Sequence, residues 1–242
     1  MNWIRKICYQ IIALCSRRIV LLAPLAALVG MIICKPWEKE SLYNLCAESY
    51  YWECVAIGPI PAMLLLLSGY MDNVKTDTFI LHIGGRKRLF LNLLAMNLIF
   101  SLVISLWLNL ILFFVGNGMF HTVPGDPIEH ITPVMFRTSI ALWLLLNILG
   151  LIYLIVQWLT FPMAGVAAVL LIAGMEAAGK FYFQRQLFWK YAFPPDTVLY
   201  LSPDGFGRGM LWLFAYTIVL LCILLAVLQK KDFLARHVEQ YE

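Results

Sequence analysis

The chain has 242 residues, of which 62% are hydrophobic and 13% are charged, and its formal net charge is +4. An ordinary soluble domain is about half apolar and a quarter charged, so the composition excludes a soluble globular fold for most of the chain. A separate catalytic or nucleotide-binding domain is excluded as well. Such a domain needs about 100 residues, and the apolar runs leave only loops and short tails.

Residues 2–18 combine an apolar face with basic residues at both ends. The apolar side chains share one helical face: Trp3, Ile4, Ile7, Ile11 and Leu14. This pattern predicts an amphipathic helix that lies in the membrane interface. No small-residue cleavage site follows it, so we expect no cleaved signal peptide.

Apolar runs of about 20 residues match the hydrocarbon thickness of a bilayer. The sequence predicts about six such spans, at residues 19–34, 54–71, 89–115, 134–158, 161–179 and 209–229. Pro59 and Pro61 in the second span are compatible with a kinked helix, because neighbouring helices can satisfy the freed carbonyls. We therefore expect an all-α integral membrane protein that forms a single transmembrane domain over residues 1–242.

The polar and aromatic connections between the spans set the expected topology. Basic residues concentrate in cytoplasmic loops near span ends. If both termini are cytoplasmic, 11 of the 18 Lys and Arg residues lie on the cytoplasmic side. These are Arg5, Lys6, Arg17, Arg18, Lys75, Arg86, Lys87, Arg88, Lys230, Lys231 and Arg236. The loop at residues 72–88 is then cytoplasmic. The aromatic, proline-containing segment at residues 180–208 lies against the outer membrane surface.

Charged residues inside a span usually mark function, and these spans hold few. Glu176 and Arg137 are placed near the outer interface, where we expect both side chains to reach the headgroups. An ion-coupled carrier or proton pump is expected to need more charges. The scarcity of charged residues in the spans favours a protein complex whose energy source lies on the cytoplasmic side.

Motifs of known chemistry are nearly absent. Residues 174–180 match the start of a phosphate-binding loop, but Phe181 stands where a magnesium-binding Ser or Thr is needed. His121, Asp126, Glu129 and His130 lie close in sequence, yet a solvated loop explains them better than a metal site does. We therefore expect no catalytic, cofactor or metal site in this chain.

Six cysteines lack the C-x-x-C spacing of a zinc or redox site. Most are expected to be small apolar fillers of the helix packing. Cys46 and Cys54 share one predicted external loop and are candidates for a disulfide in an oxidising compartment, although spacing alone does not fix the pairing.

The cytoplasmic loop contains a candidate protein-binding helix. Thr76 is a candidate N-cap, and the apolar residues that follow share one side of a short helix: Phe79, Ile80 and Ile83. Gly84 and Gly85 end that helix before Arg86 begins a basic cluster at the headgroups. An exposed apolar face predicts a protein partner. An interfacial turn that merely precedes a positive-inside anchor explains the pattern equally well.

The whole chain, taken in order, resembles a permease subunit of the type 2 class of ATP-binding-cassette exporters, in a compact six-span form. The resemblance lies in the amphipathic entry helix at residues 2–18 and the loop end Ile83-Gly-Gly-Arg-Lys-Arg-Leu-Phe90. The aromatic, proline-bearing stretch before the last span and the terminal Lys230-Lys-Asp-Phe233 complete it.

The resemblance implies a role for the cytoplasmic loop. In this family the loop between the second and third spans docks into a separate ATPase, which assigns coupling to Thr76, Phe79, Ile80, Ile83, Gly84, Gly85 and Arg86. ATP and magnesium are then bound by that ATPase, and a second permease subunit, the same or homologous, faces this one. Nucleic acid is not an expected partner, and the expected location is the plasma membrane of a bacterium.

The apolar spans favour a hydrophobic or amphipathic substrate, with an antimicrobial or bacteriocin-like peptide first and a lipid-like molecule second. Two other functions stay open. A non-transport assembly partner in a larger membrane complex needs only spans and interfaces. A lipid-modifying membrane enzyme would need clustered carboxylates, histidines or metal ligands, which only the patch at residues 126–130 approaches.

Overall fold

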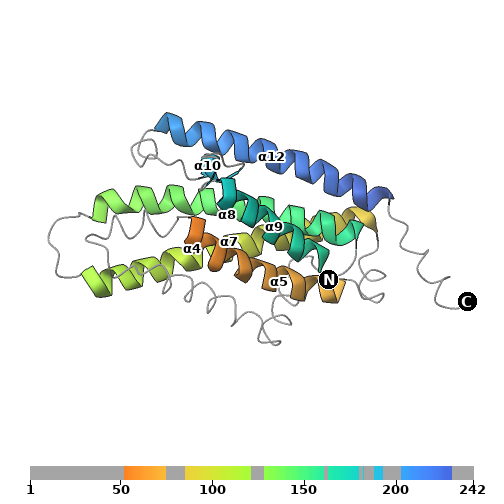
Figure 1. The fold of residues 1–242 in the computed structure, drawn as a ribbon, viewed down its shortest axis with the longest axis horizontal. Helices are drawn as coiled ribbons and strands as arrows, with labels where there is room; N and C mark the ends of the chain where they lie inside the picture. Colours follow the sequence, from red (N-terminus) through yellow and green to blue (C-terminus); the bar gives the residue numbers. More distant parts are fainter. Residues whose placement is uncertain are drawn as a thin grey trace, which may run out of the picture.

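The computed structural model describes residues 52–74, 85–120, 128–160, 163–179, 182, 188–192 and 203–230. All secondary structure in these residues is helical, as expected (Figure 1). The helices are α4 (Trp52–Ile57), α5 (Pro59–Val74), α7 (Arg86–Phe120), α8 (Ile128–Leu159), α9 (Ala164–Ala178), α10 (Trp189–Ala192) and α12 (Pro203–Lys230). The predicted interfacial helix at residues 2–18 and the predicted first span lie outside the described residues.

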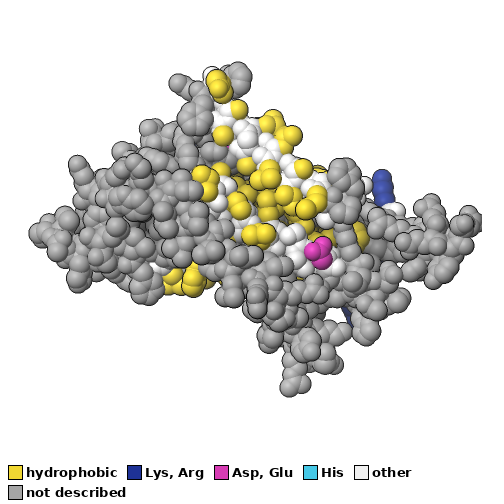
Figure 2. All heavy atoms as spheres, turned by 60° about the horizontal axis from the view of Figure 1, so that its bottom comes forward, with side chains coloured by type: hydrophobic (Ala, Val, Ile, Leu, Met, Phe, Trp, Pro, Cys, Tyr) yellow, Lys and Arg dark blue, Asp and Glu magenta, His cyan; other side chains and the backbone are white. Residues whose placement is uncertain are grey.

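Four helical stretches in the described ranges are long and apolar enough to cross a bilayer: Cys54–Asp72, Arg86–Leu110, Met135–Leu159 and Phe206–Lys230. They correspond to the predicted second, third, fourth and sixth spans. On the face shown in Figure 2, hydrophobic side chains form a broad band, and the visible charged side chains lie toward one end. The chain is therefore a helical protein with the character of a multi-pass membrane protein.

The predicted fifth span is a helix, but a short one. Helix α9 has 15 residues, so it is about 22 Å long and does not match a hydrocarbon core of about 30 Å. Met163 precedes it in the left-handed conformation, with φ of 76°. Helices α8 and α9 thus form a tight hairpin in which one arm is half the length of the other.

Two prolines occur at the start of α5 without interrupting the span. The amide of Gly58 donates to the carbonyl of Cys54 at 3.0 Å, and the amide of Ala62 donates to the carbonyl of Gly58 at 3.1 Å. Because proline has no amide hydrogen, the helix keeps its path through the donors on either side of Pro59 and Pro61. Helices α4 and α5 therefore act as one membrane-length unit.

Helix α8 is the centre of the described bundle. It contacts α5, α7, α9, α10 and α12, and its buried residues supply much of the hydrophobic core. Figure 1 shows α12 along one side of α8, with α4 and α5 on the other side of the bundle. Helices α7 and α8 run antiparallel, as their paired contacts Asn97 with Asn147 and Ser105 with Ser139 require.

Candidate functional site

The exit from the predicted cytoplasmic loop lies at a junction of two helix ends. Gly85 has a φ of 145°, in a region that L side chains rarely adopt, and α7 begins at the next residue. The guanidinium of Arg86 then donates through Nη1 to the carbonyl oxygen of Gln229 at 2.6 Å. The start of α7 is thereby tied to the last turn of α12.

This bond satisfies a carbonyl that the helix itself leaves open. The last four carbonyls of an α-helix have no partner within it, and the C-terminal end of its dipole attracts positive charge. Arg86 supplies both a donor and a positive charge to this end of α12, and Arg86, Lys87 and Arg88 are all exposed. Basic residues of α7 and Lys230 of α12 therefore gather at one end of the bundle.

The predicted coupling residues divide into two groups. Gly85 and Arg86 lie at this junction, whereas Thr76, Phe79, Ile80, Ile83 and Gly84 lie outside the described residues. The bounds of the helices show that Asp72 to Val74 belong to α5 and that Arg86 to Arg88 form the first turn of α7. Residues 75–84 therefore connect two helices whose ends are fixed.

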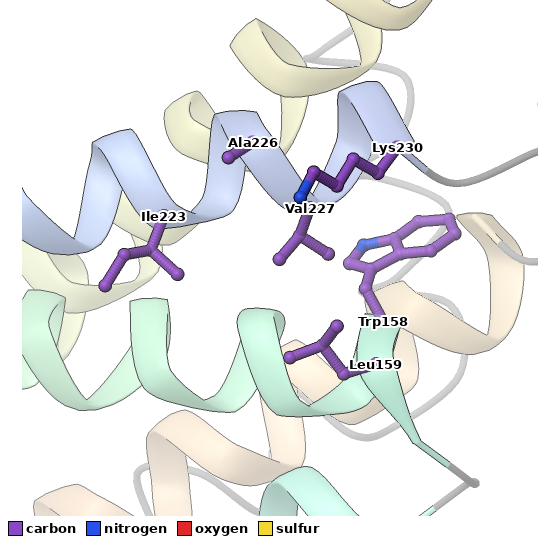
Figure 3. Close-up of a pocket in the computed structure, with 6 residues that line it drawn as sticks. All are labelled: Trp158, Leu159, Ile223, Ala226, Val227 and Lys230. Atoms are coloured by element: carbon purple, nitrogen blue, oxygen red, sulfur yellow. The ribbon is translucent and has the colours of Figure 1, made fainter.

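A groove opens beside the junction, between the last turns of α8 and α12 (Figure 3). Its volume is about 500 Å³, and its lining residues are Trp158, Leu159, Ile223, Ala226, Val227 and Lys230. All of these except Lys230 are apolar or aromatic. Figure 3 shows the Lys230 side chain running back along α12, so that its nitrogen lies beside Val227.

A polar seam joins α7 to α8 within the apolar bundle. Four residues of α7 recur at every fourth position: Asn97, Ser101, Ser105 and Asn109. Asn97 donates through Nδ2 to the side-chain oxygen of Asn147 at 2.8 Å and to its carbonyl at 3.0 Å. Ser105 donates to the carbonyl of Ser139 at 2.7 Å. These direct bonds hold α7 against α8, while Ser101 bonds to the Asn97 carbonyl in its own helix and the buried Oδ1 of Asn97 has no hydrogen-bond partner among the described residues.

This seam is not among the sites expected from the sequence, because its residues carry amides and hydroxyls rather than charges. The signal was the four-residue spacing, which places all four side chains on one face of a helix. Gly150 completes the arrangement: a Cβ at that position would collide with Oδ1 of Asn97. The amide of Asn97 therefore lies directly over the backbone of α8.

The expectation that Glu176 reaches the headgroups is wrong. Its side chain is 3% exposed, and its Oε1 accepts a hydrogen bond from the amide of Phe188 at 2.6 Å. A buried carboxylate needs such donors, because it has left water. Glu176 thus fastens the end of α9 to the chain just before α10. Arg137, by contrast, is half-buried with its guanidinium over the ring of Phe206, 5.9 Å from the centroid.

The end of the bundle opposite the junction carries an aromatic cluster. Tyr191 of α10 lies 5.7 Å from the ring of Trp212 and 6.3 Å from that of Tyr216, and Phe188 packs edge-on against Tyr216 at 5.1 Å. Gly209 allows this approach, since a Cβ there would collide with the carbonyl oxygen of Tyr191. Aromatic side chains of this kind suit a membrane interface.

The other candidate motifs form no functional site within the described residues. Residues 174–178 belong to α9, so the partial phosphate-loop match is helical. Within the described ranges no group of three His, Cys, Asp or Glu side chains could hold a metal ion. His121 and Asp126 lie outside these ranges, as do the side chains of Glu129 and His130. Cys54 is buried in α4, and Cys46 is not described, so their disulfide stays a prediction.

No protein-family model matches the chain, and comparison with curated proteins and with solved structures finds no match. The residues themselves therefore carry any functional assignment. Among the described features, the junction of Gly85, Arg86 and Gln229 links the exit of the loop at residues 75–84 to α12.

Proposed function

We propose that this chain is the membrane-spanning permease subunit of an ATP-driven exporter and is coupled to a separate ATPase through residues 76–85. The observation that carries the proposal is the bond from Arg86 to the carbonyl of Gln229. Through this bond, a force applied to the loop acts on two helices, α7 directly and α12 through its last turn.

The packing supports transmission beyond these two helices. Both α7 and α12 contact α8, which in turn contacts α5, the helix that enters the loop. A partner that moves the loop therefore acts on a closed circuit of packed helices. Discrete rearrangements of packed elements are the usual carriers of such coupling.

Gly85 is the natural pivot of this arrangement. Its φ of 145° suits glycine, and a Cβ built there would have no atom within 4 Å. A larger side chain would therefore meet backbone strain rather than a steric clash. The angle between the loop and α7 depends on the glycine conformation, while the space around it stays open.

The proposed substrate is hydrophobic or amphipathic, an antimicrobial or bacteriocin-like peptide first and a lipid-like molecule second. Support comes from the apolar spans and from the scarcity of charge within them. We keep the assembly-partner function as the alternative, because an all-helical bundle with a basic end also fits it. ATP hydrolysis is assigned to the partner, with ATP and magnesium bound there, and a second permease subunit completes the path.

Introducing a negative charge into the loop tests the proposal. A candidate ABC ATPase is co-expressed and co-purified with the Phe79→Asp and Ile83→Asp variants. Thr78→Asp is the control on the opposite side of the predicted helix. We expect the first two to lose ATPase retention and substrate-stimulated ATP turnover, because their apolar side chains would be buried in the ATPase. Thr78→Asp should retain both. Unchanged retention and transport in the Phe79 and Ile83 variants would favour the assembly partner.

A second pair of variants separates coupling from binding. We expect Arg86→Gln to retain the ATPase but to lose about 0.3–1 kcal/mol of α12 stabilisation, seen as faster amide exchange in the last turn of that helix. Gly85→Val should likewise bind and yet uncouple ATP turnover from transport. Lys87→Gln, at the next exposed position, is the matched control. Equal exchange in the Arg86 and Lys87 variants would show that the bond does not hold α12.

A further inference from the structure

The groove between α8 and α12 has its polarity arranged along the helix axis. Lys230 lies at the end of α12, whereas Ile223 lies seven residues earlier, about 10 Å deeper along the helix. Ala226 and Val227 line the wall between them, and Trp158 and Leu159 of α8 line the opposite side (Figure 3). Because the Lys230 nitrogen lies beside Val227, the charge of the groove is about one turn in from the end of α12, and the groove is apolar from there toward Ile223.

The groove also lies on a surface that the bundle leaves open. Only 22% of the apolar window of α12 is buried, and Ile223 and Leu159 are 43% and 60% exposed. In a membrane-spanning helix, such a face meets lipid. The end that carries Lys230 also carries Arg86, because Arg86 donates to Gln229, the residue before Lys230.

Lys230 makes no ion pair with another described residue, although its ammonium lies over the groove. A cation near the membrane surface attracts anionic headgroups. An occupant must therefore be anionic at one end and apolar for about 6 Å below it, the rise from Val227 to Ile223. A phospholipid has this shape and is already present at this surface.

We propose that the groove is a binding site for an anionic phospholipid of the leaflet at the basic end. An acyl chain lies along Ile223, Ala226 and Val227, and the phosphate is held by Lys230. The apolar walls do not select among lipids, because lipid tails are as apolar as the groove. Selection comes from the charge of Lys230, so an anionic headgroup is preferred over a zwitterionic one. The proposal does not depend on coupling to an ATPase.

Lipid retention measured by native mass spectrometry tests the site. The full chain is purified in a mild detergent and exposed to equal amounts of phosphatidylglycerol and phosphatidylcholine. One basic residue at the membrane surface contributes about 1 kcal/mol, so the wild type should retain phosphatidylglycerol in about fivefold preference. Lys230→Gln should abolish this preference. Ala226→Trp, which fills the groove, should lower retention of both lipids.

Two control variants lie on the same helix outside the groove. Arg208→Gln removes an exposed cation near the start of α12, and Ala215→Trp adds the same bulk at another exposed alanine. Both should behave as the wild type. Equal retention of the two lipids by the wild type would overturn the proposal, as would a preference that survives Lys230→Gln. Losses in the controls as large as those in the groove variants would overturn it too.

Discussion

Helices α8 and α12 are both apolar and long enough to span a bilayer, yet they hold opposite positions in the bundle. In α8, 67% of the apolar window is buried, against 22% in α12, although α12 has the higher mean hydropathy. The difference lies in the polar residues. Helix α8 receives hydrogen bonds from α7 at Asn147 and Ser139, whereas the buried Thr217 of α12 donates only to Leu213 in its own helix.

This contrast shows what directs packing when lipid surrounds the protein. Lipid tails are as apolar as leucine, so hydrophobicity brings a helix into the membrane but gives it no preference for a protein neighbour. Small residues and interhelical hydrogen bonds supply that preference. Helix α8 has both, in Gly150 and the seam with α7, and α12 has neither along most of its length.

The largest effect is expected where the seam is tightest. Gly150→Ala would drive a methyl group into Oδ1 of Asn97 and toward Leu67, so we expect a loss of about 3 kcal/mol, measured by reversible unfolding in mixed micelles. Gly207→Ala in α12 is the control, because a Cβ there has no atom within 4 Å. It should be neutral or slightly stabilising. Equal destabilisation by the two variants would break the contrast between the helices.

Two leucine substitutions, one in each helix, test how much apolar packing alone contributes to the free energy of unfolding. Leu146 of α8 is fully buried, and Leu211 of α12 is 72% exposed. We expect Leu146→Ala to lose about 2 kcal/mol, the low end of the range for core leucines, because lipid offers the unfolded helices an apolar surrounding. Leu211→Ala should change the free energy of unfolding by less than about 0.5 kcal/mol. A large loss at Leu211 would mean that another chain covers α12.

The smallest expected effect is the interaction energy between the side-chain amides of Asn97 and Asn147. A double-mutant cycle of Asn97→Ala and Asn147→Ala should give an interaction energy of about 0.6–1.7 kcal/mol, the range for hydrogen bonds between membrane helices. The same cycle between Asn97 and Thr217 should give none, since Thr217 bonds within α12. A coupling near zero for Asn97 and Asn147 would show that steric fit, rather than the hydrogen bonds, holds α7 against α8.

The position and burial of several residues depended on the tertiary structure. Glu176 resembled an interfacial side chain in sequence, because it stands near the end of an apolar run, but the amide of Phe188 reaches back to it and buries it. The carbonyl of Gln229 and the guanidinium of Arg86 are 143 positions apart, and no local pattern predicts their bond. The groove beside Lys230 likewise depends on how two distant helices meet.

The sequence by itself determined the membrane environment and the class of fold. Apolar runs of membrane length predicted helices, and helices occupy the described ranges that correspond to four of the predicted spans. It also located the glycine before α7 and the basic residues at the loop exit. Tertiary structure alone decided which helix lies at the centre and which faces outward. The physical reason is that transfer into lipid depends on each segment separately, whereas packing depends on shape and hydrogen bonds shared between segments far apart in the chain.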